Sequence, residues 1–181
     1  GKTIYFTSYR DDFVGGDTNG DGTTVGDVAD WGEIVFGEDS SATFDYATLR
    51  YSGYTGVTNR AVFLASQYTI PVVGDHVSLT DNRINGIQLP SGTLPFGSHT
   101  FPSYPAAPYY LDGDFTIPVG SSLTIAAGAI IKLEGDDIFI QGTLTAVGEP
   151  GKTIYFTSYR DDFVGGDTNG DGVTSPAQNN W

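Results

Sequence analysis

The first 22 residues of the chain recur without a change 150 positions later. The segment GKTIYFTSYRDDFVGGDTNGDG occupies residues 1–22 and again residues 151–172. Trp31 recurs as Trp181, but seven of the eight residues before each tryptophan differ, with Thr24 matching Thr174, which a cloning duplication would not produce. We interpret residues 1–150 as one full repeat and residues 151–181 as the start of the next, equivalent to residues 1–31. Long tandem repeats are typical of proteins that stack units end to end.

Short β-strands are predicted throughout, and no segment has the periodicity of an amphipathic helix. The predicted strands are rich in Ile, Val, Thr, Leu, Phe and Tyr, with Gly, Asn, Asp or Pro between them. They are Thr3–Thr7, Glu33–Phe36, Ala47–Tyr51, Ala61–Leu64, Val77–Thr80, Gly86–Leu89, Ser122–Ile125, Ala129–Leu133, Asp137–Gly142 and Thr153–Thr157.

The spacing of the last strands favours a coiled arrangement. Strand signals at residues 122, 137 and 152 start about 15 residues apart, with glycine at the corners between them. An antiparallel sandwich also has many short strands, but the Asn-Gly and Asp-Gly hairpin signals that it needs are few. The fold class expected is therefore all-β, a parallel β-helix or solenoid with about 20–25 residues in each coil.

Several segments resemble a known family of repeats. DFTIPVGSSLTIAAGAIIKL at 114–133, IFIQGTLTAVG at 138–148, WGEIVF at 31–36 and LTDNRINGI at 79–87 are similar to rungs of right-handed parallel β-helices. Such repeats occur in large secreted surface proteins of bacteria and archaea. The resemblance implies a right-handed solenoid and an extracellular location. It is weakest at residues 91–110, where clustered prolines predict an irregular excursion on the surface.

Composition excludes several classes of partner. The net charge is −14, from 22 acidic and 8 basic residues, so the surface repels nucleic acid and anionic membranes and favours cations. Cysteine is absent, which rules out a disulfide framework and thiol catalysis. No apolar run approaches the ~20 residues that cross a bilayer as a helix. Because residue 1 falls inside a motif that recurs, we expect the chain to be a window of a longer polypeptide, with any targeting signal outside it.

The repeated acidic loop is a candidate calcium site. In DTNGDG at 17–22, side-chain oxygens alternate at the first, third and fifth positions and glycine follows, as in the front half of a Ca²⁺ loop. The twelfth position holds Val28 in one copy and Gln178 in the other, so this is not an EF-hand. The alternative is a solvated turn capped by its own side chains. The candidate ligands are Asp17, Asn19 and Asp21, with Asp11 and Asp12 nearby, and their counterparts Asp167, Asn169, Asp171, Asp161 and Asp162.

Other polar residues point less clearly to a site. Asp81 and Arg83 are the one carboxylate–base pair on a predicted strand, and clustered carboxylates serve β-helix enzymes that cleave polysaccharides. His76 and His99 are expected to be surface residues. The tyrosines of residues 104–110 fit either a sticky lateral patch or buried loop packing. No motif for nucleotide binding or serine hydrolysis is present.

The sequence thus predicts a mechanical rather than catalytic protein. We expect a structural repeat of an extracellular, calcium-stabilised filament, stalk or adhesin, whose partners are neighbouring copies joined head to tail. The alternatives are an adhesin surface that binds carbohydrates or cells and, less favoured, a polysaccharide-degrading enzyme. The fold alone does not decide among them.

Overall fold

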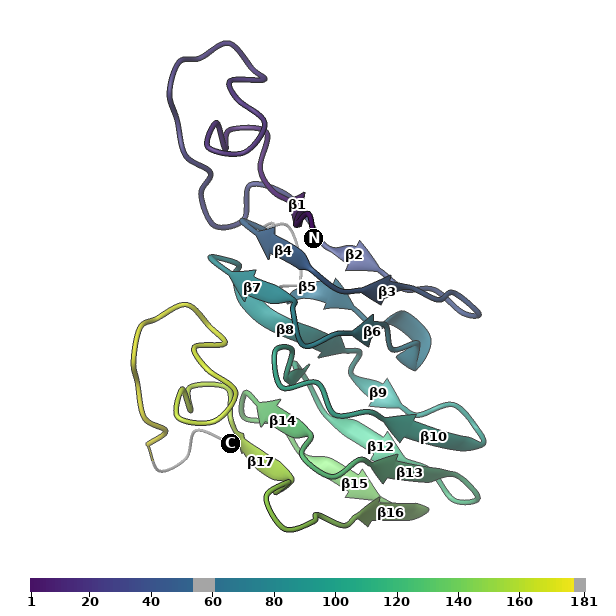
Figure 1. Ribbon diagram of the computed structural model, residues 1–181. Coiled ribbons are helices and arrows are strands. Elements are labelled where there is room, and N and C mark those ends of the chain that lie inside the picture. The colour runs from purple at the N-terminus through teal and green to yellow at the C-terminus, as the bar shows by residue number, and fades with distance from the viewer. Residues whose placement is uncertain (54–60, 178–181) are drawn as a thin grey trace.

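The computed structural model describes residues 1–53 and 61–177, and in this part of the chain the architecture is a parallel β-solenoid. Figure 1 shows the coils stacked along one axis. One short 3₁₀ helix, Ser66–Tyr68, is present in the described residues, and every other element is a strand. The strands are β1 (Ile4–Phe6), β2 (Ile34–Val35), β3 (Thr43–Phe44), β4 (Ala47–Arg50), β5 (Ala61–Leu64), β6 (Val72–Val73), β7 (Ser78–Thr80), β8 (Ile84–Leu89), β9 (Gly92–Thr93), β10 (Ser98–Phe101), β11 (Tyr109–Leu111), β12 (Phe115–Ile117), β13 (Ser122–Ile125), β14 (Ile130–Leu133), β15 (Ile138–Ile140), β16 (Thr143–Ala146) and β17 (Tyr155–Ser158).

Each coil passes three faces in a fixed order. The second face is one sheet of six parallel strands, in the order β17-β14-β11-β8-β5-β2. The first face, which precedes it in each coil, consists of the sheet β1-β4-β7 and then the sheet β10-β13-β16. The third face consists of β3-β6 and then β15-β12-β9. All paired strands in these sheets are parallel.

The length of a coil follows from the register of the second face. Phe63 pairs with Ile87, Ile87 with Tyr109, Tyr109 with Ile131, and Ile131 with Phe156. The differences between these residue numbers are 24, 22, 22 and 25, which agree with the predicted coil length. Parallel strands need such long connections because a tight hairpin cannot return the chain to the same end of the sheet.

These paired residues also form the core. Phe63, Ile87, Tyr109 and Ile131 point inward in a continuous ladder, and each is at most 2% exposed. Fully burying a side chain of this size contributes about 1.5–3 kcal/mol. The alternating inward positions of the first and third faces, such as Leu123 and Ile117, close the same interior. The apolar ladders therefore stabilise the stack along its whole length.

Close contacts between neighbouring coils require particular residues at two positions. Asn82 is 1% exposed and its side chain bonds the backbone of the preceding coil, accepting from Ser52 N and donating to Leu49 O, each at 2.9 Å. A Cβ on Gly86 would lie 2.5 Å from the carbonyl oxygen of Pro108, so glycine is required there. Asn82 thus holds the turn between β7 and β8, and Gly86 lets β8 lie close to the following coil.

All ten predicted strand segments overlap observed strands, but the expectation for residues 91–110 was wrong in part. Ser98–Phe101 forms β10 and pairs with β13, and Tyr109 and Tyr110 are buried in β11. The prolines lie between these strands rather than in them, where their missing N–H groups break no ladder. Of the two interpretations of the tyrosines, buried packing is correct for Tyr109 and Tyr110, and these two residues form no lateral patch.

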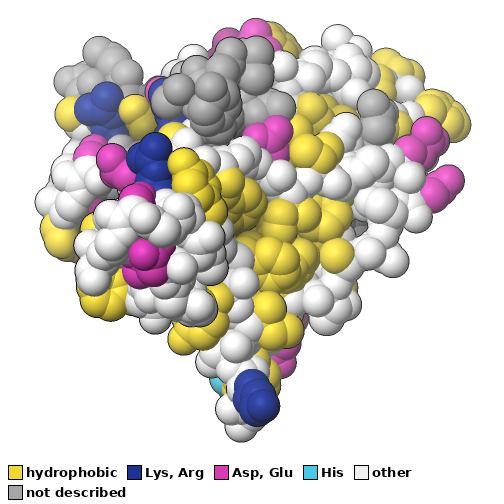
Figure 2. Space-filling view, turned by 90° about the horizontal axis from the view of Figure 1, so that it is seen from above, with side chains coloured by type: hydrophobic (Ala, Val, Ile, Leu, Met, Phe, Trp, Pro, Cys, Tyr) yellow, Lys and Arg dark blue, Asp and Glu magenta, His cyan; other side chains and the backbone are white. Residues whose placement is uncertain are grey.

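The two ends of the stack expose apolar strands. Ile4, Tyr5 and Phe6 of β1 are 58%, 46% and 37% exposed, whereas Ala61–Leu64 in the interior strand β5 is buried throughout. At the other end Phe139 and Ile140 of β15 are 45% and 53% exposed. Figure 2, which views the stack from the end that carries β1, shows apolar side chains across the middle of this end. No helix of the described residues is long and apolar enough to cross a membrane.

Candidate metal centre

The two acidic loops follow β1 and β17 and have the same internal structure. In the first loop Asp17 Oδ1 accepts a hydrogen bond from Gly20 N at 2.6 Å, and Asp17 Oδ2 accepts one from Gly22 N at 3.2 Å. In the second loop the bonds from Gly170 and Gly172 to Asp167 measure 2.7 and 3.0 Å. Gly20 and Gly170 have φ values of 75° and 70°, which a residue with a Cβ rarely adopts. The repeated sequence therefore folds the same way locally in both places.

Three carboxylates converge in each loop. One oxygen each of Asp12, Asp17 and Asp21 lies within 4.8 Å of the other two, and the same holds for Asp162, Asp167 and Asp171. Asp12 is fixed by hydrogen bonds to its Oδ2 from Thr24 N at 2.6 Å and Thr24 Oγ1 at 3.1 Å. Its Oδ1 is buried and accepts no hydrogen bond from any described residue, as is also true of Asp162 Oδ1. Like charges held this close repel one another unless a cation or proton intervenes.

The asparagine of each loop lies beside these carboxylates. Asn19 Nδ2 donates to Asp21 Oδ2 at 2.8 Å, and Asn169 Nδ2 donates to Asp171 Oδ2 at the same distance. Asn169 Oδ1 is buried and has no hydrogen-bond partner among the residues that the structure describes. Carboxylate and amide oxygens are the ligands that Ca²⁺ prefers. The donor set of each loop therefore suits a hard cation. Gln178 and Trp181 lie outside the described residues.

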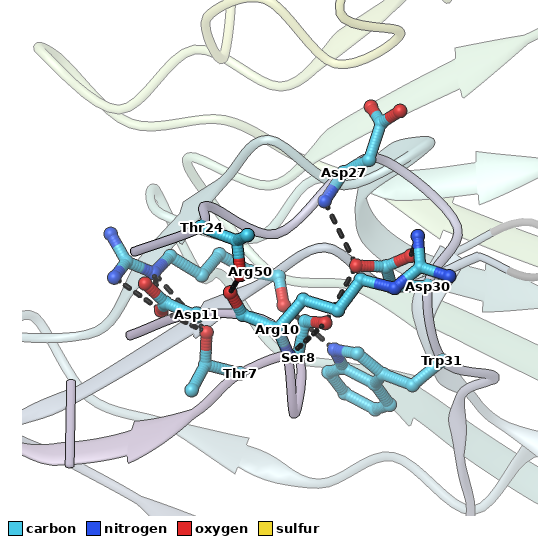
Figure 3. A network of polar contacts seen from close by, with 9 residues as sticks. All are labelled: Thr7, Ser8, Arg10, Asp11, Thr24, Asp27, Asp30, Trp31 and Arg50. Carbon is cyan, nitrogen blue, oxygen red and sulfur yellow. Dashed lines mark hydrogen bonds and ion pairs between the residues drawn. The ribbon is translucent and has the colours of Figure 1, made fainter. Parts of the chain in front are cut away.

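Asp11 and Asp161 lie outside these two groups of carboxylates. Asp11 is buried, and its Oδ2 accepts from the Arg50 guanidinium and from Thr7 Oγ1. Figure 3 shows Arg50 and Thr7 meeting on this carboxylate. In the second copy Asp161 accepts the corresponding bond from Thr157 Oγ1, at 2.7 Å. These two aspartates thus anchor the base of each loop to its strand.

The first loop is also closed by residues that follow it. Asp30 Oδ2 accepts from Ser8 Oγ at 2.6 Å and from Asp27 N at 2.9 Å, and Asp30 Oδ1 is 3.6 Å from the Arg10 guanidinium. Figure 3 places Trp31 next to this group, where its Nε1 donates to Arg50 O at 2.7 Å. Asp27 and Asp30 are therefore engaged in closing the loop.

A buried lysine holds the second loop from the other side. Lys132 of β14 is fully buried, and its Nζ donates to the carbonyl oxygens of Asp161 and Gly166 at 2.9 and 2.8 Å. Burial lowers the pKa of Lys132 to about 8, although the nearby carboxylates of Asp162 and Asp161 act in the opposite direction. Sequence reasoning missed both Lys132 and Arg50. The available signal was that each is a single basic residue within a predicted strand of a strongly acidic chain.

The second loop also lies against an earlier coil. Asn85, at the start of β8, donates from its N to Thr168 O at 2.8 Å and from its Nδ2 to Asp167 O at 3.0 Å. Thr168 is fully buried, whereas the identical Thr18 of the first loop is exposed. Asp81 lines a groove with Asp167 at this contact, but it lies in a turn, and no ion pair with Arg83 forms within the described part of the chain.

Comparison with known proteins gives one partial similarity. No protein-family model and no solved structure matches the chain. A stretch of 91 residues is 33% identical to part of the phosphoribosylformylglycinamidine synthase subunit PurL of Natronomonas pharaonis. The match covers 50% of this chain but 12% of that protein. The chain thus corresponds to a small part of its relative's length, and the similarity does not assign it to a family.

Proposed function

We propose that this chain is a structural repeat unit of an extracellular, calcium-stabilised β-solenoid filament, stalk or adhesin, in which copies join head to tail. The observation that carries the proposal is the pair of open ends of the stack. Strand β1 exposes Ile4, Tyr5 and Phe6 at one end, and β15 exposes Phe139 and Ile140 at the other. A sheet edge with unpaired backbone groups is a template for a further strand.

The energetic argument favours a neighbour of the same kind. In an interior coil the apolar ladder is covered on both sides, as for Leu49 and Ile131, which are 0% and 2% exposed. Covering an end with another coil extends that ladder and pairs the edge backbone, and burial of apolar surface contributes about 25 cal/mol per Å². The sequence supplies the start of such a coil, because residues 151–172 are identical to residues 1–22. The proposed role is therefore mechanical.

Calcium enters the proposal through the two groups of three carboxylates. Asp12, Asp17 and Asp21 would supply ligands in the first loop, and Asn19 lies beside them, with its Nδ2 donating to Asp21 Oδ2. An ion that binds only the folded loop stabilises the fold by mass action, by about 2.7 kcal/mol when its free concentration is 100 times Kd. With a net charge of −14, a bound cation also relieves repulsion across the surface.

The calcium part is tested by thermal unfolding in EDTA and after Ca²⁺ is returned. We expect the melting temperature to fall on chelation and to recover with Ca²⁺. The Asp17→Asn/Asp167→Asn variant, which removes one carboxylate from each loop, should respond far less. Asp136→Asn, outside both loops, serves as the control and should respond like the unaltered chain. A melting temperature that is unaffected by EDTA would contradict a stabilising calcium site.

The assembly part is tested on the native material by electron microscopy and fibre diffraction. We expect filaments with a strand spacing of ~4.8 Å along the axis and surface exposure on intact cells, detected by antibody labelling. Isolated monomers with capped ends in the native state would overturn the filament proposal and favour the adhesin or enzyme alternatives.

A further inference from the structure

The repeated strand pairs on opposite sides in its two copies. In the first copy β1 pairs with the strand that follows it along the stack, with Phe6 opposite Leu49 of β4. In the second copy β17 pairs with the strand that precedes it, with Phe156 opposite Ile131 of β14. Phe6 and Phe156 are the same residue of the repeat. Each copy therefore shows one of the two neighbours that a single strand in the middle of a sheet would have.

The backbone groups used in the two copies do not compete. Ile4 N donates to Tyr46 O at 2.9 Å, toward the following coil. Tyr155 N donates to Ala129 O at 3.1 Å, toward the preceding coil. Ile4 and Tyr155 correspond to adjacent residues of the repeat, and successive N–H groups of a strand point to opposite sides. One copy of this strand is thus able to pair with a β14 and a β4 at the same time.

The loop contacts are complementary in the same way. The first loop is held from the following coil, through the Arg50 guanidinium on the Asp11 carboxylate. The second loop is held from preceding coils, through Lys132 on two carbonyl groups and Asn85 on two others. Lys132 binds the carbonyl oxygen of Asp161. The carboxylate of Asp161 can therefore still accept from an arginine of a following coil, as the Asp11 carboxylate accepts from Arg50.

The directions of the two loops also agree with one repeat segment that contacts both a preceding and a following coil. The second loop lies over the outer side of the six-stranded sheet, where Tyr159 packs against Tyr110 with ring centroids 6.2 Å apart. Figure 1 shows this loop alongside the coils, whereas the first loop extends past β1 beyond the end of the stack. Tyr9, which corresponds to Tyr159, is 60% exposed. The first loop therefore reaches into the space that the coils of a preceding copy would fill.

We propose that the first loop is a preformed clasp for a preceding copy of the same repeat. In the junction, the strand at residues 4–6 takes the place of β17 on β14 of that copy, and the loop lies over its six-stranded sheet. Lys132 of the preceding copy binds the carbonyl groups of Asp11 and Gly16, and its Asn85 binds those of Asp17 and Thr18. This inference rests on the head-to-tail assembly proposed above and specifies its contact.

The junction has a geometric consequence. β1 lies on the first face and β17 on the second, so the repeat advances by five coils and one further face. The six-stranded sheet of one copy then continues into the β1-β4-β7 sheet of the next. At ~4.8 Å per coil the axial advance is about 26 Å, and successive copies are offset by one of the three faces.

The test uses the full chain extended at its C-terminus by a second copy of residues 32–181. In this tandem chain, residues 155–158 acquire the coil that follows them. We expect hydrogen exchange at the Phe156 amide, which points away from β14, to slow at least about tenfold relative to the 181-residue chain. The Tyr155 amide is the matched control, because its bond to Ala129 exists in both chains. Asn85→Ala in the 181-residue chain should speed exchange in residues 165–170 and leave residues 15–20 unchanged.

Structure determination of the tandem chain gives a second readout. The inference requires the strand at 155–158 to lie between β14 and the second copy's β4, with the copies offset by one face. Unchanged exchange at Phe156, a tandem chain that does not fold, or copies that superpose without the offset would each overturn it. Native filaments whose copies lack the offset would refute the clasp but would still agree with the filament proposal. A correct tandem junction without native filaments would refute only the filament proposal.

Discussion

The repeated sequence allows one buried ion pair to be tested against its own copy. Asp11 and Asp161 are equivalent, and each carboxylate accepts a bond from a threonine of its strand. Among the described residues, only Asp11 also faces a guanidinium, that of Arg50, whose side chain is 21% exposed. Asp11→Asn therefore leaves a cation largely buried without its direct counter-charge. Asp161→Asn weakens one hydrogen bond and removes one of the carboxylates that favour the charged form of Lys132, which keeps Asp162 nearby.

The expected costs differ by more than the error of an unfolding experiment. Breaking a buried ion pair costs about 3–5 kcal/mol, and because water reaches part of Arg50 we expect about 2–3 kcal/mol for Asp11→Asn. Asp161→Asn should cost about 1 kcal/mol, the usual value for one hydrogen bond. For a chain of this size 1 kcal/mol corresponds to about 2–4 °C, so Asp11→Asn should lower the melting temperature by roughly 4–12 °C.

Both variants are compared by circular dichroism during urea and thermal unfolding, in EDTA so that metal binding does not contribute. The double variant Asp11→Asn/Arg50→Met removes both charges, so it should lose less stability than the sum of the two single variants. Equal losses for Asp11→Asn and Asp161→Asn, or strictly additive effects in the double variant, would refute the assigned role of the pair.

Three further predictions concern residues between coils. Because burial lowers the pKa of Lys132 to about 8 from 10.5, the unfolded chain binds more protons between these values, and stability should rise as pH increases from 8 to 10, by at most about 3 kcal/mol. Lys132→Met should abolish that slope in unfolding titrations. Asn82→Ala should cost about 2–4 kcal/mol in urea unfolding because it leaves Ser52 N and Leu49 O without their buried partner. Gly86→Ala should destabilise the chain measurably, since the added Cβ meets Pro108 O at 2.5 Å; wild-type stability would contradict the close approach.

The strands that sequence predicted and those that it missed differ in a physical way. Ala61–Leu64 and Ser122–Ile125 were located exactly, because runs of β-branched and apolar residues without breakers have few other stable conformations. The missed strands are often two residues long, such as Gly92–Thr93, or lie between prolines, as Ser98–Phe101 does. Pairing with a neighbouring coil fixes the conformation of these segments, so their own composition does not reveal that they are strands.

The candidate site was predictable to the same limited extent. The acidic loops were recognised because their ligands are close in sequence, from Asp12 to Asp21. Arg50 lies 39 residues from Asp11 and Lys132 lies 29 from Asp161, so these partners depend on coil lengths that the sequence does not give. The predictions that Asp11 and Asp161 belong with the loop ligands rested on proximity in sequence, and the side chains of both residues bond at the strands instead.

The pattern of identity between the two copies has a physical explanation if the clasp is correct. Residues 1–22 and 151–172 are identical, whereas residues 23–30 match 173–180 only at Thr24 and Thr174. In the proposed junction the strand must fit Ile131 on one side and Leu49 on the other, and the loop must fit Lys132, Asn85 and Arg50 together. A substitution that suits one neighbour can then disturb the other, because both neighbours contact the same short segment. Thr24 and Thr174 extend this rule beyond the identical segment, since each backbone N–H bonds, at 2.6 Å, the first aspartate of its group of three carboxylates, Asp12 and Asp162. Between the identical segment and Trp31, the sequence should therefore be constrained at single positions such as Thr24 rather than along the whole connection. Among alanine substitutions of the non-glycine residues of 23–28, the largest loss of stability should occur at Thr24. Gly26 is left out of this comparison because an added Cβ would lie 2.3 Å from the Tyr51 ring.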